Sequence, residues 1–269
     1  MIDVHTHLHP PRLFAAIRRW FAERSSWVLE HPTEPADVAR ALREAGVERF
    51  VFCSYAHKPG IARDLNVWLC ATSRELGGYG LPLATVHLDD PDPLGDLRDA
   101  LADGAIGIKI HEDVQRLQID DIRWRALFDE LAAREAFVLV HVGRVPWSPD
   151  TQNGPARVGA VLNRHPKLRV VVAHFGRPDS SHYIAAAAAA PGLFLDTTMA
   201  FAQGSPMRAP ADPAEIERAS GFIVYGTDYP NIPYPYLRER EALQALGLSE
   251  AARARIYRDN VRRLSPALD

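Results

Sequence analysis

Eight short runs of apolar and β-branched residues recur along this chain of 269 residues, and they constrain its fold more than any other feature. Runs of this length and composition predict buried strands. Between most of them lie longer stretches with apolar residues at helical spacing, such as Leu13, Ile17, Trp20 and Phe21. The expected strands are 2–4, 47–53, 79–86, 105–110, 137–142, 168–173, 193–195 and 222–225. Strands that alternate with helices predict an α/β fold with a parallel sheet.

The number of strands favours a closed (β/α)8 barrel, the TIM barrel. A strand followed by a helix, repeated eight times in 269 residues, matches the size and element order of that fold. An open, doubly wound sheet is the alternative that the pattern leaves. No repeat of fixed period, low-complexity tract or Gly/Ser linker divides the sequence. We therefore expect a single barrel domain over residues 1–269.

The composition argues against two classes of partner. The chain has 31 Lys and Arg against 34 Asp and Glu, a net charge of −3, so it lacks the positive excess that nucleic acid binding needs. Its longest run of small apolar residues, Ala185 to Ala190, is far shorter than the roughly 20 residues of a membrane span. We expect a small-molecule substrate as the partner, and the sequence does not indicate whether the chain forms a homo-oligomer.

The first residues and the cysteines predict where the protein resides. Met1 is followed at once by Asp3 and by histidines, with no basic segment and apolar segment of a secretory signal. The two cysteines, Cys53 and Cys70, favour free thiols over a disulfide framework. We therefore expect a cytoplasmic protein.

Polar residues stand at the carboxyl ends of nearly all the expected strands. They are His5 and His7, Ser54, His87, Lys109 and His111, His141, His174, Asp196 and Thr197, and Asp228. In a (β/α)8 barrel these strand ends form the mouth, where the chemistry takes place. The sequence thus predicts an active site at the mouth.

The histidines among these residues have the pattern of a metal site. His5 and His7 form an H-x-H motif, and because side chains alternate along a strand, both imidazoles point the same way. His141 and His174 each end an apolar run, and Asp228 follows the last expected strand. Three or four imidazoles with one carboxylate suit Zn²⁺, with Mn²⁺ or Fe²⁺ as weaker candidates. The alternative is a histidine-rich barrel without a metal.

Five motifs along the chain carry a resemblance to a known family. They are D-V-H-T-H-L-H at 3–9, G-I-K-I-H at 107–111, V-H-V-G at 140–143, V-V-A-H-F-G at 171–176 and Y-G-T-D-Y-P at 225–230. In this order they resemble the amidohydrolase superfamily, in particular the amidohydrolase-related branch that includes aminocarboxymuconate-semialdehyde decarboxylase. The resemblance covers almost the whole chain. It implies a (β/α)8 barrel, a divalent metal, and hydrolysis or decarboxylation as the chemistry.

The resemblance also implies a role for each ligand-type residue. His5, His7, His141 and Asp228 would bind one metal ion. His174 would polarise a substrate carbonyl or stabilise an oxyanion, and would become a ligand if a second ion were bound. Asp228 would also accept the proton of the metal-bound water, whose pKa a metal can lower from roughly 15.7 to roughly 7.

Lys109 has two interpretations. It shares one face of the expected fourth strand with Gly107 and His111, which we expect to point into the barrel. The other face would carry Ile106, Ile108 and Ile110. In two-metal relatives a lysine on this strand is carboxylated and bridges the ions, whereas we favour a plain cation that contacts a substrate carboxylate or lies behind the ligands. TatD-like nucleases usually have a carboxylate here, so Lys109 also argues against that group.

Several residues that follow strand ends are candidates for contacts to substrate. Arg144, Trp147, Arg177 and Tyr229 have this position, and arginine suits a carboxylate-bearing substrate. Lys109 and His111 are further candidates. Ordinary surface or loop roles are the alternative for each of them.

Two other residues near the expected site receive structural interpretations. Asp3 would share the face of His5 and His7 and orient one of them, or would be a buried polar residue at the start of the strand. Cys53 lies in an apolar strand with no base near it in sequence, so we expect a core residue and not a nucleophile.

Taken together, these residues predict a metal-dependent hydrolase. A metal-activated water would attack the carbonyl carbon of an ester, lactone or amide in a small, carboxylate-bearing substrate. One alternative is a lyase on the same scaffold, which decarboxylates or hydrates an unsaturated or aromatic acid. The sequence does not separate the two, because metal, His174 and Asp228 serve both. Another alternative is a barrel that only binds a ligand.

Overall fold

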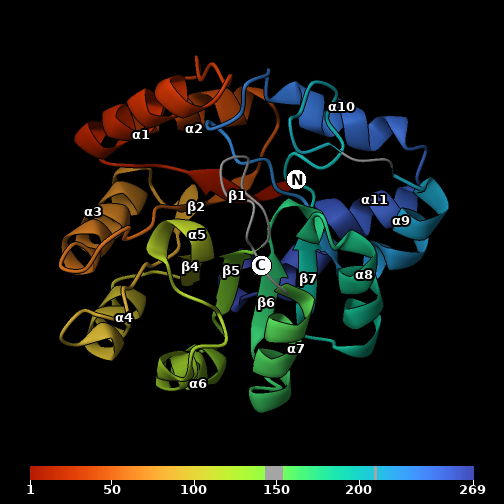
Figure 1. Cartoon of the computed structure of the whole chain (residues 1–269). Coiled ribbons are helices and arrows are strands. Elements are labelled where there is room, and N and C mark those ends of the chain that lie inside the picture. The colour runs from red at the N-terminus through yellow and green to blue at the C-terminus, as the bar shows by residue number, and fades with distance from the viewer. Residues whose placement is uncertain (143–153, 209–210) are drawn as a thin grey trace.

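The computed structural model describes residues 1–142, 154–208 and 211–269, and it confirms the predicted barrel. The strands are β1 Ile2–His7, β2 Arg49–Cys53, β3 Gly80–Pro82, β4 Gly107–His111, β5 Phe137–His141, β6 Arg169–Val172, β7 Leu193–Asp196 and β8 Ile223–Val224. All paired strands are parallel and neighbour one another in chain order. The helices lie around them (Figure 1).

The helices follow the strands as the sequence pattern predicts. They are α1 Pro11–Arg24, α2 Pro35–Glu44, α3 Ala62–Glu75, α4 Pro93–Ala102, α5 Glu112–Gln115, α6 Arg125–Ala133, α7 Gly154–Arg164, α8 Ser180–Ala189, α9 Pro213–Ala219, α10 Leu237–Ala245, α11 Glu250–Ala254 and α12 Asn260–Arg262. Pro35 and Pro93 each occupy the first position of a helix, where the absent N–H has no partner to lose. None of the helices in the described ranges is long and apolar enough to cross a membrane.

Two loose seams close the barrel. Hydrogen bonds assign β1–β3 to one sheet and β4–β8 to another, and single bridges join the sheets at Ala84 with Ile108 and at Thr6 with Tyr229. At the second seam the Val4 amide donates to Tyr225 O at 2.9 Å and the Asp228 amide donates to His5 O at 2.7 Å. The last strand is thereby joined to the first near the mouth.

Alternate residues of the strands form two apolar layers. Along β5, Phe137 and Leu139 pack inside the barrel, whereas Val138 and Val140 pack against the helices. Val261 and Leu264 from the C-terminal segment pack with the inner layer. The interior of the barrel is therefore a filled core of side chains.

Three expectations need correction. The strand expected over 79–86 is limited to Gly80–Pro82, and beyond it only isolated pairing remains: the Leu83 amide donates to Phe52 O at 2.9 Å, and Ala84 forms a single bridge with Ile108. The strand expected over 222–225 is limited to Ile223–Val224. Ile106 precedes β4 and packs with the inner layer, away from Ile108 in the outer layer.

A bulge in β1 decides between the two interpretations of Asp3 in favour of a buried polar residue at the start of the strand. Asp3 pairs with Phe50 and Thr6 pairs with Phe52, so β1 has one more residue than β2 between these positions. Asp3 and Thr6 thus share the outer face, and the extra residue turns His5 and His7 inward. The Asp3 carboxylate accepts from the His5 backbone amide at 3.1 Å and from the Thr227 hydroxyl at 2.7 Å. It braces the backbone and does not orient an imidazole.

Candidate active site

Side chains from both ends of the sequence meet at the mouth of the barrel. Asp228 Oδ1 lies 2.8 Å from His7 Nε2 and 3.2 Å from His5 Nε2. Lys109 Nζ lies 3.0 Å from His5 Nε2. All four side chains are buried, Asp228 with 9% of its surface exposed. The structure therefore brings the H-x-H motif, the late aspartate and the ambiguous lysine to one point.

His141 and His174 extend this group of residues. The His174 ring lies 5.5 Å from the His5 ring and 4.5 Å from the His141 ring, measured between centroids. His111 stacks on His141 at 4.1 Å with the ring planes 7° apart. Each residue predicted as a metal ligand thus lies in one contiguous cluster. His111 is beside the cluster, where its Nδ1 also accepts the Val114 amide.

The protonation states of three imidazoles in this cluster suit cation binding. Burial holds the pKa of His5 and His141 well below the ordinary value, and it lowers the pKa of His174 to about 4. These imidazoles are neutral and keep a lone pair for a metal. Burial opposes charge on Asp228 and His7 as well, but their contact lowers the pKa of Asp228 and, with nearby Cys53, raises the pKa of His7 to about 10.

Two nitrogen atoms in the cluster have no hydrogen-bond partner among the described residues. They are His141 Nε2 and His174 Nδ1, and both are buried. A buried polar atom without a partner costs about 1–3 kcal/mol, so such atoms point to a missing ligand or water. Together with the Asp228 carboxylate, these free nitrogens fit a divalent cation.

Asp196, at the end of β7, orients His5. Its Oδ2 accepts from His5 Nδ1 at 2.8 Å, while its Oδ1 accepts from the backbone amides of His174 at 2.8 Å and Thr198 at 3.1 Å. Burial raises the pKa of Asp196 to about 7, against the effect of Lys109 and these hydrogen bonds. With its proton on Nδ1, His5 presents the Nε2 lone pair to the cluster, as metal-binding histidines do. Sequence analysis placed Asp196 at a strand end but gave it no role.

Backbone geometry at two of these residues is unusual. His174 has φ 54° and Asp228 has φ 69°, both in the left-handed region. Residues other than glycine adopt this region at a cost of about 1–3 kcal/mol, and they do so preferentially at functional sites. The strand-to-loop turns at β6 and β8 therefore aim these two side chains at the cluster.

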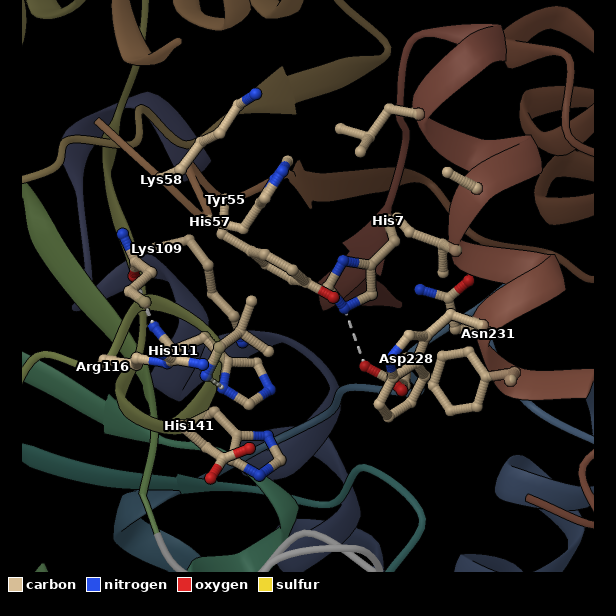
Figure 2. Close-up of a pocket in the computed structure, with 18 of the residues that line it drawn as sticks. His7, Tyr55, His57, Lys58, Lys109, His111, Arg116, His141, Asp228 and Asn231 are labelled. Carbon is tan, nitrogen blue, oxygen red and sulfur yellow. Dashed lines mark hydrogen bonds and ion pairs between the residues drawn. The ribbon is translucent and has the colours of Figure 1, made fainter. Parts of the chain in front are cut away.

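The cluster forms the floor of a pocket of about 780 Å³, a volume typical of small-molecule sites. Figure 2 shows Lys109, His111, Arg116 and His141 on one side and His7, Asp228 and Asn231 on the other. Tyr55 follows β2, lines the pocket and contacts the rings of His7 and His111 edge-on. The sequence did not predict Tyr55, Arg116 or Asn231: Tyr55 follows β2, but Arg116 follows α5 and Asn231 lies seven residues after the end of β8, and no motif marks any of the three.

Cys53 belongs to the apolar core and also lies next to the metal-ligand cluster. It packs with the inner apolar layer, as expected, and it is fully buried. Its Sγ nevertheless lies 3.5 Å from His7 Nδ1, and it offers a donor atom within 4.8 Å of those of His5 and His7. The sequence indicated no base near this thiol, but the fold places His7 beside it.

Not all the predicted substrate contacts lie on the pocket. Neither Arg177 nor Tyr229 is among the residues that line the pocket: Arg177 donates to the carbonyl of Met207, a lining residue, and Tyr229 packs against His31 at 4.8 Å and Tyr236 at 5.3 Å. Position after a strand end therefore did not fix the direction of these two side chains. Arg144 and Trp147 lie outside the described residues.

Comparisons with known proteins identify the family and support the fold. Residues 2–265 match the sequence model of a family described as Amidohydrolase. No curated protein matches the chain. An uncharacterized TIM-barrel protein from Bordetella bronchiseptica has 18% identity and a TM-score of 0.75, with 98% of each chain covered.

Two further solved structures carry names of enzymes. A probable 2-pyrone-4,6-dicarboxylic acid hydrolase from Acinetobacter baumannii has 14% identity and a TM-score of 0.66, with 98% of each chain covered. A 5-carboxyvanillate decarboxylase from Novosphingobium aromaticivorans, complexed with manganese, has 14% identity and a TM-score of 0.66, with 98% of this chain and 95% of that chain covered. At such identities the likeness shows a shared fold.

Proposed function

Since this chain belongs to the amidohydrolase family and is an enzyme of that superfamily, we propose that it is a metal-dependent hydrolase of an ester, lactone or amide. The observation that carries the proposal is the contact of the ionised Asp228 with His5 and His7, beside the free ring nitrogens of His141 and His174. His7, His141, His174 and Asp228 line the pocket, and His5 lies directly behind them. A catalytic carboxylate at that place has direct access to a bound substrate.

The metal that we propose is a single Zn²⁺ ion, held by His5, His7, His141 and Asp228. Nitrogen-rich sets with one carboxylate suit zinc, and Mn²⁺ or Fe²⁺ are the alternatives, of which manganese is bound in a protein of the same fold. Such an ion supplies a water of lowered pKa and a Lewis acid for a carbonyl oxygen. A second ion would require carboxylation of Lys109.

The protein side chains then have distinct roles. The Asp228 carboxylate accepts the proton that the attacking water loses, because its lowered pKa keeps it ionised at neutral pH. His174 hydrogen-bonds the substrate oxygen on which negative charge develops. Lys109, His111 and Arg116 lie on the opposite side of the pocket and suit a carboxylate of the substrate.

A lyase is the second candidate, which one finding supports. The manganese-bound structure of the same fold is named a decarboxylase. A hydrolase and a lyase would both act on a small molecule in this pocket. They differ in the bond of the substrate that breaks. The substrate must therefore decide between them.

One experiment separates these functions. Protein purified without chelator is analysed for metal content, reconstituted with Zn²⁺ or Mn²⁺, and tested against esters, lactones and amides by acid release. In parallel, CO₂ release and hydration are followed with aromatic and muconate-type acids. Metal-dependent acid release supports the hydrolase, and CO₂ release or hydration alone supports the lyase. Protein that binds no metal and turns over neither panel would reject both in favour of a ligand-binding barrel.

A further inference from the structure

His7 and Cys53 lie side by side on the first two strands of the barrel. They are paired residues in the ladder between β1 and β2, and the bulge in β1 turns His7 inward, onto the face where Cys53 packs. Cys53 Sγ lies 3.5 Å from His7 Nδ1, and both side chains are buried. The fold thus places a thiol against the ring of a residue in the metal-ligand cluster.

The two ring nitrogens of His7 have different surroundings. Nε2 lies 2.8 Å from Asp228 Oδ1, as the dashed line in Figure 2 marks, whereas Nδ1 contacts the Cys53 sulfur. The thiol has one hydrogen, which it donates to the Thr6 carbonyl at 3.3 Å. Toward His7 the sulfur is therefore an acceptor, and the neutral ring carries its proton on Nδ1. This tautomer leaves the lone pair of Nε2 on the side of Asp228.

We infer that Cys53 is a positioning residue that holds His7 in the tautomer and ring orientation needed for metal binding. The inference rests on the metal site of the proposed function, but not on the reaction proposed there. Cys53 gives His7 the kind of support that Asp196 gives His5, whose Nδ1 lies 2.8 Å from the Asp196 carboxylate. A thiol is a weaker acceptor than a carboxylate, so the effect at His7 is the smaller one.

Direct binding of the metal by sulfur is the alternative, because donor atoms of His5, His7 and Cys53 lie within 4.8 Å of one another. Two contacts argue against it. Asp228 and Cys53 contact different nitrogens of the His7 ring, so an ion held with Asp228 lies on the side of Nε2. The thiol also donates its hydrogen to Thr6, whereas the form that binds zinc is the thiolate. Cys53 therefore supports the ring from behind.

Serine and alanine at position 53 separate support of His7 from packing. The two side chains have nearly the same size, and only serine offers an acceptor to Nδ1. We expect Cys53→Ala to weaken zinc binding about tenfold and Cys53→Ser to stay within threefold of the parent. Competition with a chromophoric chelator measures the affinity. Equal zinc affinity of the two variants, or tighter binding by the alanine variant, would overturn the inference.

Cys70 supplies the matched control. It is the second of the two cysteines, it is buried on α3, and its Sγ lies 3.8 Å from the Ala100 carbonyl. Cys70 does not line the pocket, so we expect Cys70→Ser and Cys70→Ala to agree in zinc affinity within twofold. Urea denaturation of each metal-free variant establishes that folded protein was measured. A difference between serine and alanine as large as that at Cys53 would contradict the inference.

Cobalt in place of zinc tests the same geometry in the parent protein. A thiolate bound to Co²⁺ gives an intense charge-transfer band in the near ultraviolet, whereas a thiol behind a histidine does not. We expect the visible bands of bound cobalt without this charge-transfer band. A charge-transfer band that disappears in Cys53→Ser would make Cys53 a ligand and overturn its role as a positioning residue.

The outcomes for Cys53 and for the proposed reaction are distinguishable. A difference in zinc affinity between serine and alanine, without hydrolysis of any ester, lactone or amide by the parent, supports the role of Cys53 and rejects the hydrolase. Hydrolysis by the parent together with equal zinc affinities of the two variants does the reverse. Parent protein that binds no divalent metal rejects both.

Discussion

The two halves of the barrel interior are built on the same strands, yet one half is apolar and the other half is lined by polar and ionisable side chains. Toward the amino ends, Val4, Leu139 and Phe194 are buried among other apolar groups and stabilise the fold by about 1.5–3 kcal/mol each. Toward the carboxyl ends, one or two residues farther along the strands, His5 and His141 are also buried. Their side chains, however, are imidazoles, which are better solvated by water than by an apolar core. The comparison teaches that the apolar ends of the strands stabilise the barrel, whereas burial of the polar groups at the other ends costs part of that free energy and makes those groups available for binding and chemistry.

The largest effect that we expect concerns the polar half. Asp228→Asn keeps the size of the side chain but removes the charge that accepts a proton. We expect kcat to fall by about 10³-fold or more, since general-base catalysis alone contributes roughly 10²–10⁴-fold and a metal ligand is weakened as well. Steady-state kinetics of the metal-loaded variant measures the loss. Circular dichroism should report an unchanged fold, and a variant with near-normal turnover would rule out the proton-accepting role.

The second effect concerns the apolar half, directly below the cluster. Leu139 pairs with Lys109 across β4 and β5 and is fully buried. Leu139→Ala leaves a cavity and should lower the free energy of unfolding by about 2–5 kcal/mol. Urea denaturation of the metal-free protein measures the change. Zinc affinity of the folded variant should stay within threefold of the parent, and a larger change would show that the two halves are not separable.

The smallest effect concerns the residue that holds His5 in place. Asp196→Asn keeps a carbonyl oxygen for the backbone amides of His174 and Thr198, but it weakens the hydrogen bond to His5 Nδ1. We expect zinc affinity to fall about 10–100-fold, the usual range for such a partner of a metal-binding histidine. Competition with a chromophoric chelator measures it. Unchanged affinity together with unchanged unfolding would show that the packing around His5 fixes the ring without Asp196.

The sequence was sufficient to predict the barrel and to predict which histidines and which aspartate meet in the metal-ligand cluster. Both depend on a simple rule: parallel strands begin at one rim and end at the other, so residues at strand ends meet even when they are as far apart in the chain as His7 and Asp228. The short β3 was harder to predict, because apolar residues continue beyond Pro82, whereas the backbone there makes only isolated hydrogen bonds, from Leu83 to Phe52 and between Ala84 and the start of β4. Periodicity reports burial, and it does not report hydrogen bonding.

Details of the site required the structure for local reasons. The extra residue in β1 reverses the alternation between Asp3 and Thr6, and nothing in the sequence around it indicates a bulge. Arg177 and Tyr229 follow strand ends by five residues and Tyr55 by two, and of these three only Tyr55 lines the pocket.

The left-handed backbone at Asp228 restricts which changes this enzyme can tolerate there. Aspartate and asparagine accept such dihedral angles more readily than other side chains, because their short polar groups can bond to the local backbone. A longer acid such as glutamate would keep the charge but oppose the turn that aims it. Under the role that we propose for Asp228, a substitution at this residue therefore removes the carboxylate more easily than it moves the carboxylate to a new position.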